Sequence, residues 1–206
     1  MKKLFYLLML VSVITSCSVH KGSYDMKLQK VERTKNSENN YGESKIVNFK
    51  EEGKSKYSYE DQMIKIVWTP VSTQFGFILD NKTNHSIKII WDEAVYIDKN
   101  GSSERVMHSG VKYSESTNPQ IPTIIIKNGN VSDILIPVDN IYYVSGKYGG
   151  WNTQPLFTDW AYSQEELYIV TQEYIGKSVK ILLPLKIEGV VNEYIFTFKF
   201  EGFTPD

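Results

Sequence analysis

Apolar and polar residues alternate in short runs over most of this chain, which is the pattern of half-buried β-strands. The run 193–200 is the clearest, because its aromatic residues fall at every second position and would share one face. Strands are predicted at 63–69, 74–80, 87–91, 94–98, 104–108, 122–126, 131–136, 178–187 and 193–200. Turn-forming segments at 81–86, 99–101 and 127–130 separate several of them. Pro184 has no N–H to donate, which predicts an edge position or a bulge.

Short antiparallel strands with frequent turns predict an all-β fold, and we expect an immunoglobulin-like antiparallel β-sandwich. The chain has one cysteine and therefore lacks the paired cysteines of antibody domains. One segment has helical spacing instead. Ser163 and Glu166 form a capping-box pattern, apolar residues recur every three or four positions after it, and Gly176 is a stop signal. We predict one short helix at 164–175.

Residues 17–56 are polar and lack clustered apolar positions, so they predict a flexible tether ahead of a folded domain at 57–206. A short strand at 45–49 is the alternative for part of this segment. Residues 18–56 carry nine Lys or Arg and six acidic residues, whereas residues 57–206 carry twelve Lys or Arg and eighteen acidic residues. The tether is thus either a plain solvated linker or a contact for anionic headgroups, and the acidic domain is not expected to bind nucleic acid.

The longest apolar run stands at the N-terminus, where Lys2 and Lys3 precede residues 4–14, which contain only Ser12 as a plainly polar residue. A membrane-spanning helix needs about 20 apolar residues, so this run is too short to remain in the bilayer. Basic residues, a short apolar core and a small-residue exit are typical of a secretory signal peptide, here 1–16.

The residues that end this run, Ile14-Thr15-Ser16-Cys17, resemble the lipobox of bacterial lipoproteins. The resemblance implies cleavage between Ser16 and Cys17, a diacylglycerol on the Cys17 thiol and a further acyl chain, such as palmitate, on the new amine. Two or more chains give stable anchoring where one is marginal. The alternative is an ordinary signal peptide cut near Ser16, which would leave Cys17 as a free thiol.

The wider pattern FGFILDNKTNHSIKIIWDEAVYID, with RVMHSGVKY and IGKSVKILLPL after it, resembles uncharacterised extracytoplasmic lipoproteins with sandwich domains. That resemblance implies a fold and no activity. Position 18 is Ser rather than the Asp that resembles an inner-membrane retention signal. We therefore expect an outer-membrane location facing the periplasm if the source has two membranes.

The segment 141–162 is the strongest candidate for binding, because it gathers seven aromatic residues with Gly149, Gly150 and several amides and acids. Flat aromatic rings beside polar groups suit a sugar or an extended peptide. The candidate ligand-binding residues are Tyr148, Trp151, Asn152 and Asp159. The alternative, which we favour from sequence, is that the loop packs its aromatic residues on the sandwich. In either case we expect Trp160 to be core and Trp151 to be more exposed.

An enzyme would have to draw on Asp92, Glu93, His108 and Ser109, but no spaced catalytic signature accompanies them. His20, His85 and His108 do not have metal-ligand spacing. We therefore predict a non-catalytic protein with no metal and no cofactor. Its expected role is that of an envelope structural or interaction protein that contacts the membrane through Cys17 and binds an envelope glycan or protein.

Overall fold

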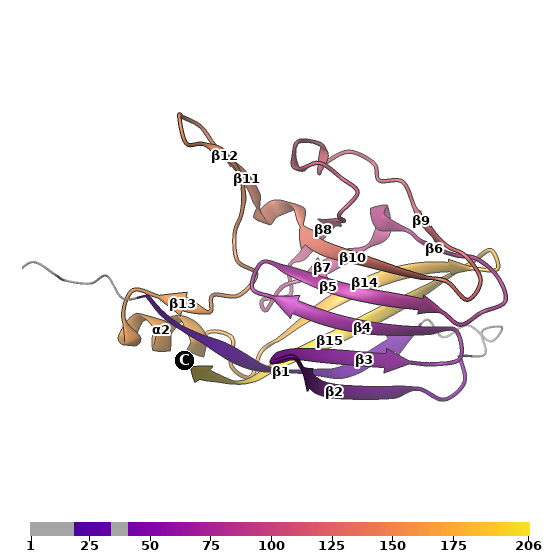
Figure 1. The fold of residues 1–206 in the computed structure, drawn as a ribbon, viewed down its shortest axis with the longest axis horizontal. Coiled ribbons are helices and arrows are strands. Elements are labelled where there is room, and N and C mark those ends of the chain that lie inside the picture. The colour runs from indigo at the N-terminus through magenta and orange to yellow at the C-terminus, as the bar shows by residue number, and fades with distance from the viewer. Residues whose placement is uncertain (1–18, 34–40) are drawn as a thin grey trace, which may run out of the picture.

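The computed structural model describes residues 19–33 and 41–206, and in those residues the protein is all-β with one α-helix, as predicted (Figure 1). The helix α2 spans Gln164–Gln172. The strands are β1 His20–Arg33, β2 Lys45–Glu51, β3 Lys54–Glu60, β4 Ile64–Val71, β5 Gln74–Asn81, β6 Ile87–Ile89, β7 Val95–Ile97, β8 Ser103–Met107, β9 Thr123–Ile125, β10 Asn130–Pro137, β11 Ile141–Val144, β12 Gly150–Thr153, β13 Trp160–Ala161, β14 Ser178–Ile187 and β15 Val190–Pro205.

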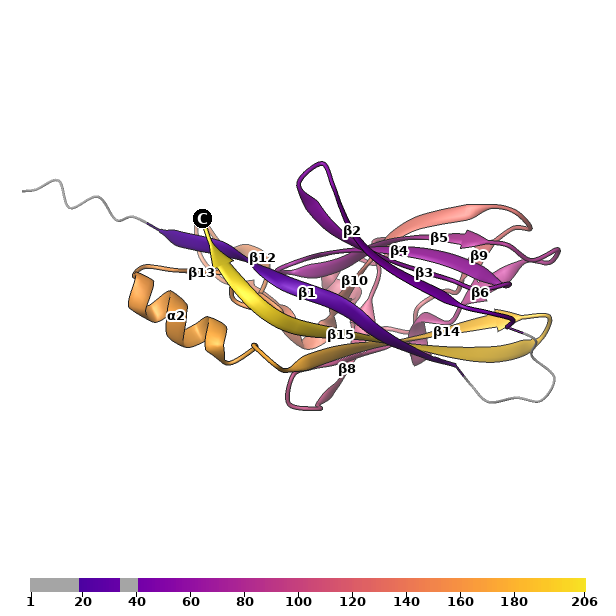
Figure 2. The ribbon, with the colours of Figure 1, turned by 90° about the horizontal axis from the view of Figure 1, so that it is seen from below.

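Most strands belong to one antiparallel sheet of 13 strands, in the order β13-β1-β15-β14-β7-β8-β10-β5-β4-β3-β2. Off this path, β6 pairs with β14, and β9 pairs with β6. The sheet curls so that β1, β15 and β14 face β2 to β5, which makes the fold sandwich-like (Figure 2). One sheet folded over on itself thus forms the two layers. The strands β11 and β12 form a separate two-stranded sheet.

Aromatic side chains fill the space between the two layers. Trp68 of β4 lies against Phe196 and Phe198 of β15, with ring centroids 5.1 and 5.9 Å apart. Phe75 of β5 reaches the same Phe198 at 5.0 Å. The alternation predicted for 193–200 is therefore confirmed, and its aromatic face is the centre of the core.

The prediction of a flexible tether at 17–56 is wrong for the residues that the structure describes. β1 pairs with β15 from Gly22–Pro205 to Arg33–Tyr194, and it buries Tyr24, Met26 and Leu28 in the core. The strand predicted at 45–49 is confirmed as β2, and β3 also begins before residue 57. The folded unit therefore includes 19–33 and 41–56. Cys17, Ser18 and 34–40 lie outside the described residues.

One side chain on the edge strand β2 bridges the two ends of the curled sheet. Asn48 of β2 accepts a hydrogen bond from the Leu28 N–H at 3.1 Å and donates one to the Leu28 carbonyl at 3.4 Å. Leu28 lies at a register shift between β1 and β15. The amide of Asn48 thus pairs with the β1 backbone as a neighbouring strand would, and it joins the two ends of the sheet.

Pro184 lies where β14 changes partner. β14 pairs with β7 over 180–182 and with β6 over 185–187, while Pro184 pairs with Glu193 of β15 on its other side. The Pro184 carbonyl accepts from the Ile90 N–H at 3.0 Å. The missing N–H is tolerated because the neighbouring strand is interrupted there, a third solution beside the predicted edge or bulge.

The predicted helix is confirmed with Ser163 as its N-cap, although it ends at Gln172 rather than at 175 and the Glu166 side chain bonds one residue ahead of the N-cap. Ser163 Oγ accepts from the Glu166 N–H at 3.1 Å, and Glu166 Oε2 accepts from the Tyr162 N–H at 3.2 Å. Leu167 and Thr171 are its buried residues. Over 19–33 and 41–206, no helix has the length and apolar content required to cross a membrane.

Candidate functional site

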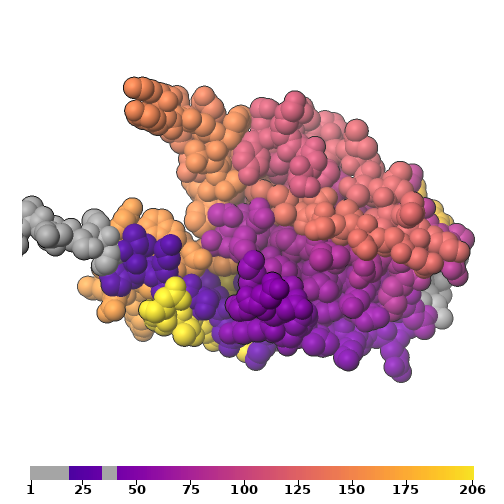
Figure 3. Space-filling model, in the orientation of Figure 1, coloured from indigo at the N-terminus to yellow at the C-terminus, as the bar shows by residue number. Residues whose placement is uncertain are grey.

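The candidate binding segment contains a hairpin that projects from the body of the protein (Figures 1 and 3). Its strands β11 and β12 pair from Ile141–Thr153 to Val144–Gly150. At its base, the Gln154 N–H donates to the Asn140 carbonyl at 2.7 Å, and the Asn140 amide returns a bond to the Gln154 carbonyl at 3.2 Å. These bonds close the base of the hairpin, and the rest of it is presented to solvent.

The hairpin carries its aromatic side chains exposed. Tyr148, near the tip, is 92% exposed, and Lys147 Nζ lies 5.4 Å from its ring centroid. Trp151 is 45% exposed and stands opposite Tyr143 in the register. Their ring centroids are 5.4 Å apart with the planes at 64°. The two rings therefore form a stepped, edge-to-face surface.

Glycines make the hairpin turn possible. Gly146 has φ 119°, a conformation that L side chains rarely adopt. A Cβ on Gly149 would lie 2.0 Å from the Val144 carbonyl oxygen, so no other residue fits there without movement of the backbone. The turn thus fixes which residues face each other across the hairpin. Recognition of this turn in the sequence would have added Tyr143 to the candidate residues as the partner of Trp151.

Beyond the hairpin the segment returns to the core. Leu156 and Phe157 are buried, and the Phe157 ring lies 5.5 Å from Tyr24 and 5.4 Å from Phe200. The packing alternative is therefore correct for this part and wrong for the hairpin. Tyr148, Trp151 and Asn152 all lie on the hairpin, but Trp151 and Asn152 are consecutive in β12 and therefore face opposite sides of it. Asn152 Nδ2 donates to the Gly150 carbonyl at 3.1 Å. Asp159 is not part of that group; its carbonyl accepts from the Gly22 N–H of β1.

The prediction that Trp160 is core is wrong. Trp160 is 37% exposed, whereas its neighbour Ala161 is buried. Both belong to β13, which pairs with the start of β1 at the edge of the sheet. Because side chains alternate along a strand, the orientation that buries Ala161 turns Trp160 outward. The expectation that Trp151 is more exposed than Trp160 is confirmed.

His108 and Ser109, the residues on which a hydrolase would depend, lie together with Asp133. Asp133 Oδ1 accepts from the Ser109 N–H at 2.9 Å and from Ser109 Oγ at 2.7 Å. His108 Nδ1 lies 3.2 Å from Asp133 Oδ2, and the His108 ring stacks on Trp91 with centroids 4.4 Å apart. The serine hydroxyl donates to the carboxylate rather than to the imidazole. Asp133 Oδ1 also accepts from the Ile134 N–H at 2.8 Å, so this oxygen has three donors that hold the local backbone, which favours a structural role.

Asp92 has structural partners as well. Its carboxylate accepts from Arg105 Nη2 at 2.6 Å and from the Gln120 N–H at 3.0 Å. Glu93 lies beside it, exposed, in a single turn of 3₁₀ helix at Trp91–Glu93. Within the described ranges, no group of three or more His, Cys, Asp or Glu residues has the arrangement of a metal site.

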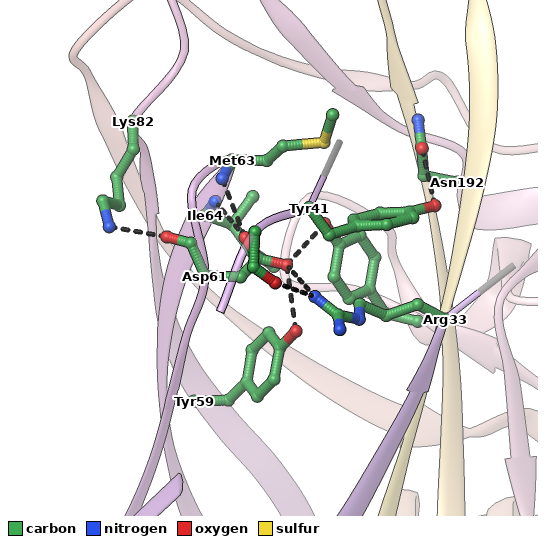
Figure 4. A network of polar contacts seen from close by, with 10 residues as sticks. Arg33, Tyr41, Tyr59, Asp61, Met63, Ile64, Lys82 and Asn192 are labelled. Carbon is green, nitrogen blue, oxygen red and sulfur yellow. Dashed lines mark hydrogen bonds and ion pairs between the residues drawn. The ribbon is translucent and has the colours of Figure 1, made fainter. Parts of the chain in front are cut away.

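A second polar cluster, which the sequence did not reveal, surrounds the buried Asp61 between the two layers (Figure 4). Asp61 Oδ2 accepts from the hydroxyls of Tyr59 at 2.9 Å and Tyr194 at 3.2 Å, and Arg33 Nη1 lies 3.6 Å away. Asp61 Oδ1 accepts from the N–H groups of Met63 and Ile64 at 2.8 and 2.9 Å. We call these residues, together with Tyr41 and Asn192, the Asp61 cluster.

The Asp61 cluster has the chemistry of a structural clamp. Burial, followed by the charge of Asp61, raises the pKa of the Tyr59 and Tyr194 hydroxyls above its ordinary value. Both hydroxyls are therefore protonated at neutral pH and act as donors to the carboxylate. Arg33 comes from β1, Tyr59 from β3 and Tyr194 from β15, so a single carboxylate connects three strands of the curled sheet.

Comparisons of the chain with protein-family models, with curated proteins and with solved structures find no match. The hairpin, the polar clusters and the N-terminal sequence are therefore the features from which a function can be inferred.

Proposed function

We propose that this protein is a non-catalytic lipoprotein of the cell envelope, anchored through acyl chains on Cys17, that binds a partner protein with its exposed aromatic hairpin. The anchor is supported by the signal-peptide pattern, by the residues Ile14-Thr15-Ser16 and by Cys17 being the only cysteine. The site of action is extracytoplasmic, and in a source with two membranes it is the periplasmic face of the outer membrane.

The observation that carries the binding function is the exposure of large aromatic side chains on an arm outside the core. Exposed apolar patches on a soluble surface mark interaction sites. Residues 142–153 consist largely of Tyr, Trp, Ser, Gly and Asn. Antibody paratopes have the same composition, because Tyr and Trp supply contact area at low entropic cost and small polar residues supply adaptable hydrogen bonds.

The geometry favours a protein over a sugar as the ligand. Sugars stack on the flat face of an exposed ring. Here Trp151 and Tyr143 meet edge to face, so they form a step that suits the relief of a protein surface. The bonding of Ser109 to Asp133 and of Asp92 to Arg105 supports a non-catalytic role.

The binding function is tested with membranes and sacculi from the source cells. The detergent-solubilised full chain would be immobilised, and the envelope proteins that it retains quantified for wild type, Tyr148→Ala, Trp151→Ala and, as a matched control, Tyr162→Ala. An aromatic hot spot contributes about 2 kcal/mol, so retention of a specific protein should weaken about 30-fold in each hairpin variant. It should be unchanged in the control.

Two results would contradict this reading. Identical sets of retained proteins for wild type and both hairpin variants would exclude the hairpin as the binding site. Binding to purified sacculi that Trp151→Ala abolishes would instead establish a glycan ligand. Thermal unfolding serves as the folding control, because these exposed side chains contribute little buried area.

The anchor is tested independently by metabolic labelling with a clickable fatty acid. Wild type should take up the label and partition into the detergent phase, and Cys17→Ala should do neither. Wild-type protein without label would refute the lipoprotein proposal while leaving the hairpin proposal intact.

A further inference from the structure

The position of β1 restricts how far the folded body can lie from its anchor. β1 begins at His20, and Val19 is the first residue that the structure describes. Only Ser18 stands between Cys17 and Val19, so the two are two residue steps apart, and an extended chain advances at most about 3.6 Å per residue. The Cα atom of Cys17 therefore lies within about 7 Å of that of Val19. An acylated Cys17 brings this end of the sheet to the membrane, with no long tether between them.

The surface at this end is apolar and aromatic. Figure 1 shows the start of β1, β13, α2 and the C-terminus together at one end of the molecule. Trp160 of β13 pairs with Lys21 of β1, and its ring lies 5.3 Å from the exposed Tyr162. A groove of about 580 Å³ lies between α2 and the ends of β1 and β15, and Val19 and the 66% exposed Tyr168 both line it.

The residue types at this surface match one partner, the interface of a lipid bilayer. Trp and Tyr concentrate at the headgroup level, where one part of the side chain is apolar and the other is wet. Among the residues that line the groove, Lys21 is basic and Asp206 is acidic, and Glu165 and Glu166 lie in the first turn of α2. They provide no excess of positive charge for anionic headgroups. The contact therefore depends on the apolar and aromatic side chains rather than on charge.

We propose that the surface formed by Val19, Trp160, Tyr162 and Tyr168 is seated in the interface of the bilayer that holds the Cys17 acyl chains. This rests on the proposed lipid anchor. The seated surface fixes the orientation of the body, and it leaves the opposite end, with β9, facing away from the membrane (Figure 1). The hairpin projects from the body separately, so the bilayer contact and the partner contact use different residues.

Spin labels on the acylated full chain test this orientation. Because Cys17 carries lipid, an introduced cysteine would be the only free thiol. Tyr168→Cys, Tyr148→Cys and Ile124→Cys place a nitroxide on α2, on the hairpin and on β9, and all three side chains are exposed, so the fold should tolerate them. The chain would be reconstituted in phosphatidylethanolamine–phosphatidylcholine vesicles, and collisions with oxygen and with a water-soluble nickel complex would be measured.

The ratio of the oxygen collision rate to the nickel collision rate should be several-fold higher for the label at 168 than for the label at 124. This ratio should not change between 0.05 and 0.5 M salt. Equal accessibility at 168 and 124 in an acylated chain would overturn the seated surface and leave the anchor standing. A chain without fatty-acid label would overturn both. Immersion at 148 without immersion at 168 would overturn this proposal, whereas immersion at both would support it and remove the hairpin from partner binding.

Discussion

The Asp61 cluster allows a quantitative test of what holds the two layers together. Tyr59→Phe and Tyr194→Phe each remove one hydroxyl donor to the buried Asp61 Oδ2 and leave the ring in place. A hydrogen bond to a charged group contributes about 1.5–3 kcal/mol. Each variant should therefore lose about 2 kcal/mol of unfolding free energy.

Tyr41→Phe is the matched control within the same cluster. Its hydroxyl donates to Asn192 Oδ1, a neutral acceptor, at 2.8 Å. A hydrogen bond between neutral groups contributes about 0.5–1.5 kcal/mol, so this variant should lose roughly half as much. Tyr162→Phe, in which the altered hydroxyl is exposed, should change stability by less than about 0.5 kcal/mol.

The double variant Tyr59→Phe/Tyr194→Phe should be less stable than the sum of the two single changes predicts. With one hydroxyl removed, Oδ2 retains the other; with both removed, only Arg33 at 3.6 Å remains. A coupling of about 0.5–3 kcal/mol is typical for residues that share a partner. Asp61→Asn should cost about 3–5 kcal/mol, because it removes the charge and leaves Arg33 without its carboxylate.

Urea unfolding followed by circular dichroism measures these changes. For a slope near 2 kcal/mol per molar urea, a loss of 2 kcal/mol lowers the midpoint by about 1 M. Losses for Tyr59→Phe and Tyr194→Phe that equal the loss for Tyr162→Phe would refute the clamp. A fully additive double variant would show that the two hydroxyls do not share one carboxylate oxygen.

Two further predictions concern β1 and the partly buried Glu104. Leu28→Ala should lower the free energy of unfolding in urea by about 2–5 kcal/mol, because Leu28 is a core residue. The control Ile124→Ala, at an exposed position, should change it by close to zero. Equal and small effects of both changes would instead support a flexible tether at this segment. Burial, followed by the charges of Asp139 and Asp98, raises the pKa of Glu104. The contribution of Glu104 to stability is therefore fully present below the ordinary pKa of about 4.3 and is lost as pH rises through the raised value. Glu104→Gln should therefore be more stable than wild type at pH 7, by less than about 1 kcal/mol, and equal to it at pH 3; a variant that is less stable at pH 7 would contradict this.

The sequence predicted the later strands and the helix because their signals are local. The aromatic alternation of 193–200 and the capping box at Ser163 each depend on neighbouring residues. β1 is not apparent from the average composition of residues 17–56, which is polar. Within it, every second residue from 24 to 28 is buried, namely Tyr24, Met26 and Leu28. The residues between them, Asp25 and Lys27, face solvent and make the segment polar overall. The period of two was present and carried the information.

The candidate site was predictable only in part, for a different reason. The segment 141–162 could be singled out from its glycines and aromatic residues, but it was expected to be a loop, and its hairpin was not predicted. The exposure of Trp160 depends on which way an edge strand of two residues faces. The Asp61 cluster gathers residues from 33 to 194, and no spacing rule connects Arg33 with Tyr194. Contacts that join distant segments are products of the fold, so a single sequence does not display them.

The pairing of β1 with the rest of the sheet bears on the proposed function. β1 is secured along its whole length: Ala161 and Trp160 pair with its first residues, Asn48 binds its backbone at Leu28, and Arg33 at its end contacts Asp61. A flexible linker would let the body rotate freely above a lipid anchor. If Cys17 carries the proposed lipid, a strand that begins three residues after it and reaches the core at Tyr24 would instead transmit the position of the anchor to the whole sheet. The proposed orientation at the membrane would then follow from the same residues that stabilise the fold.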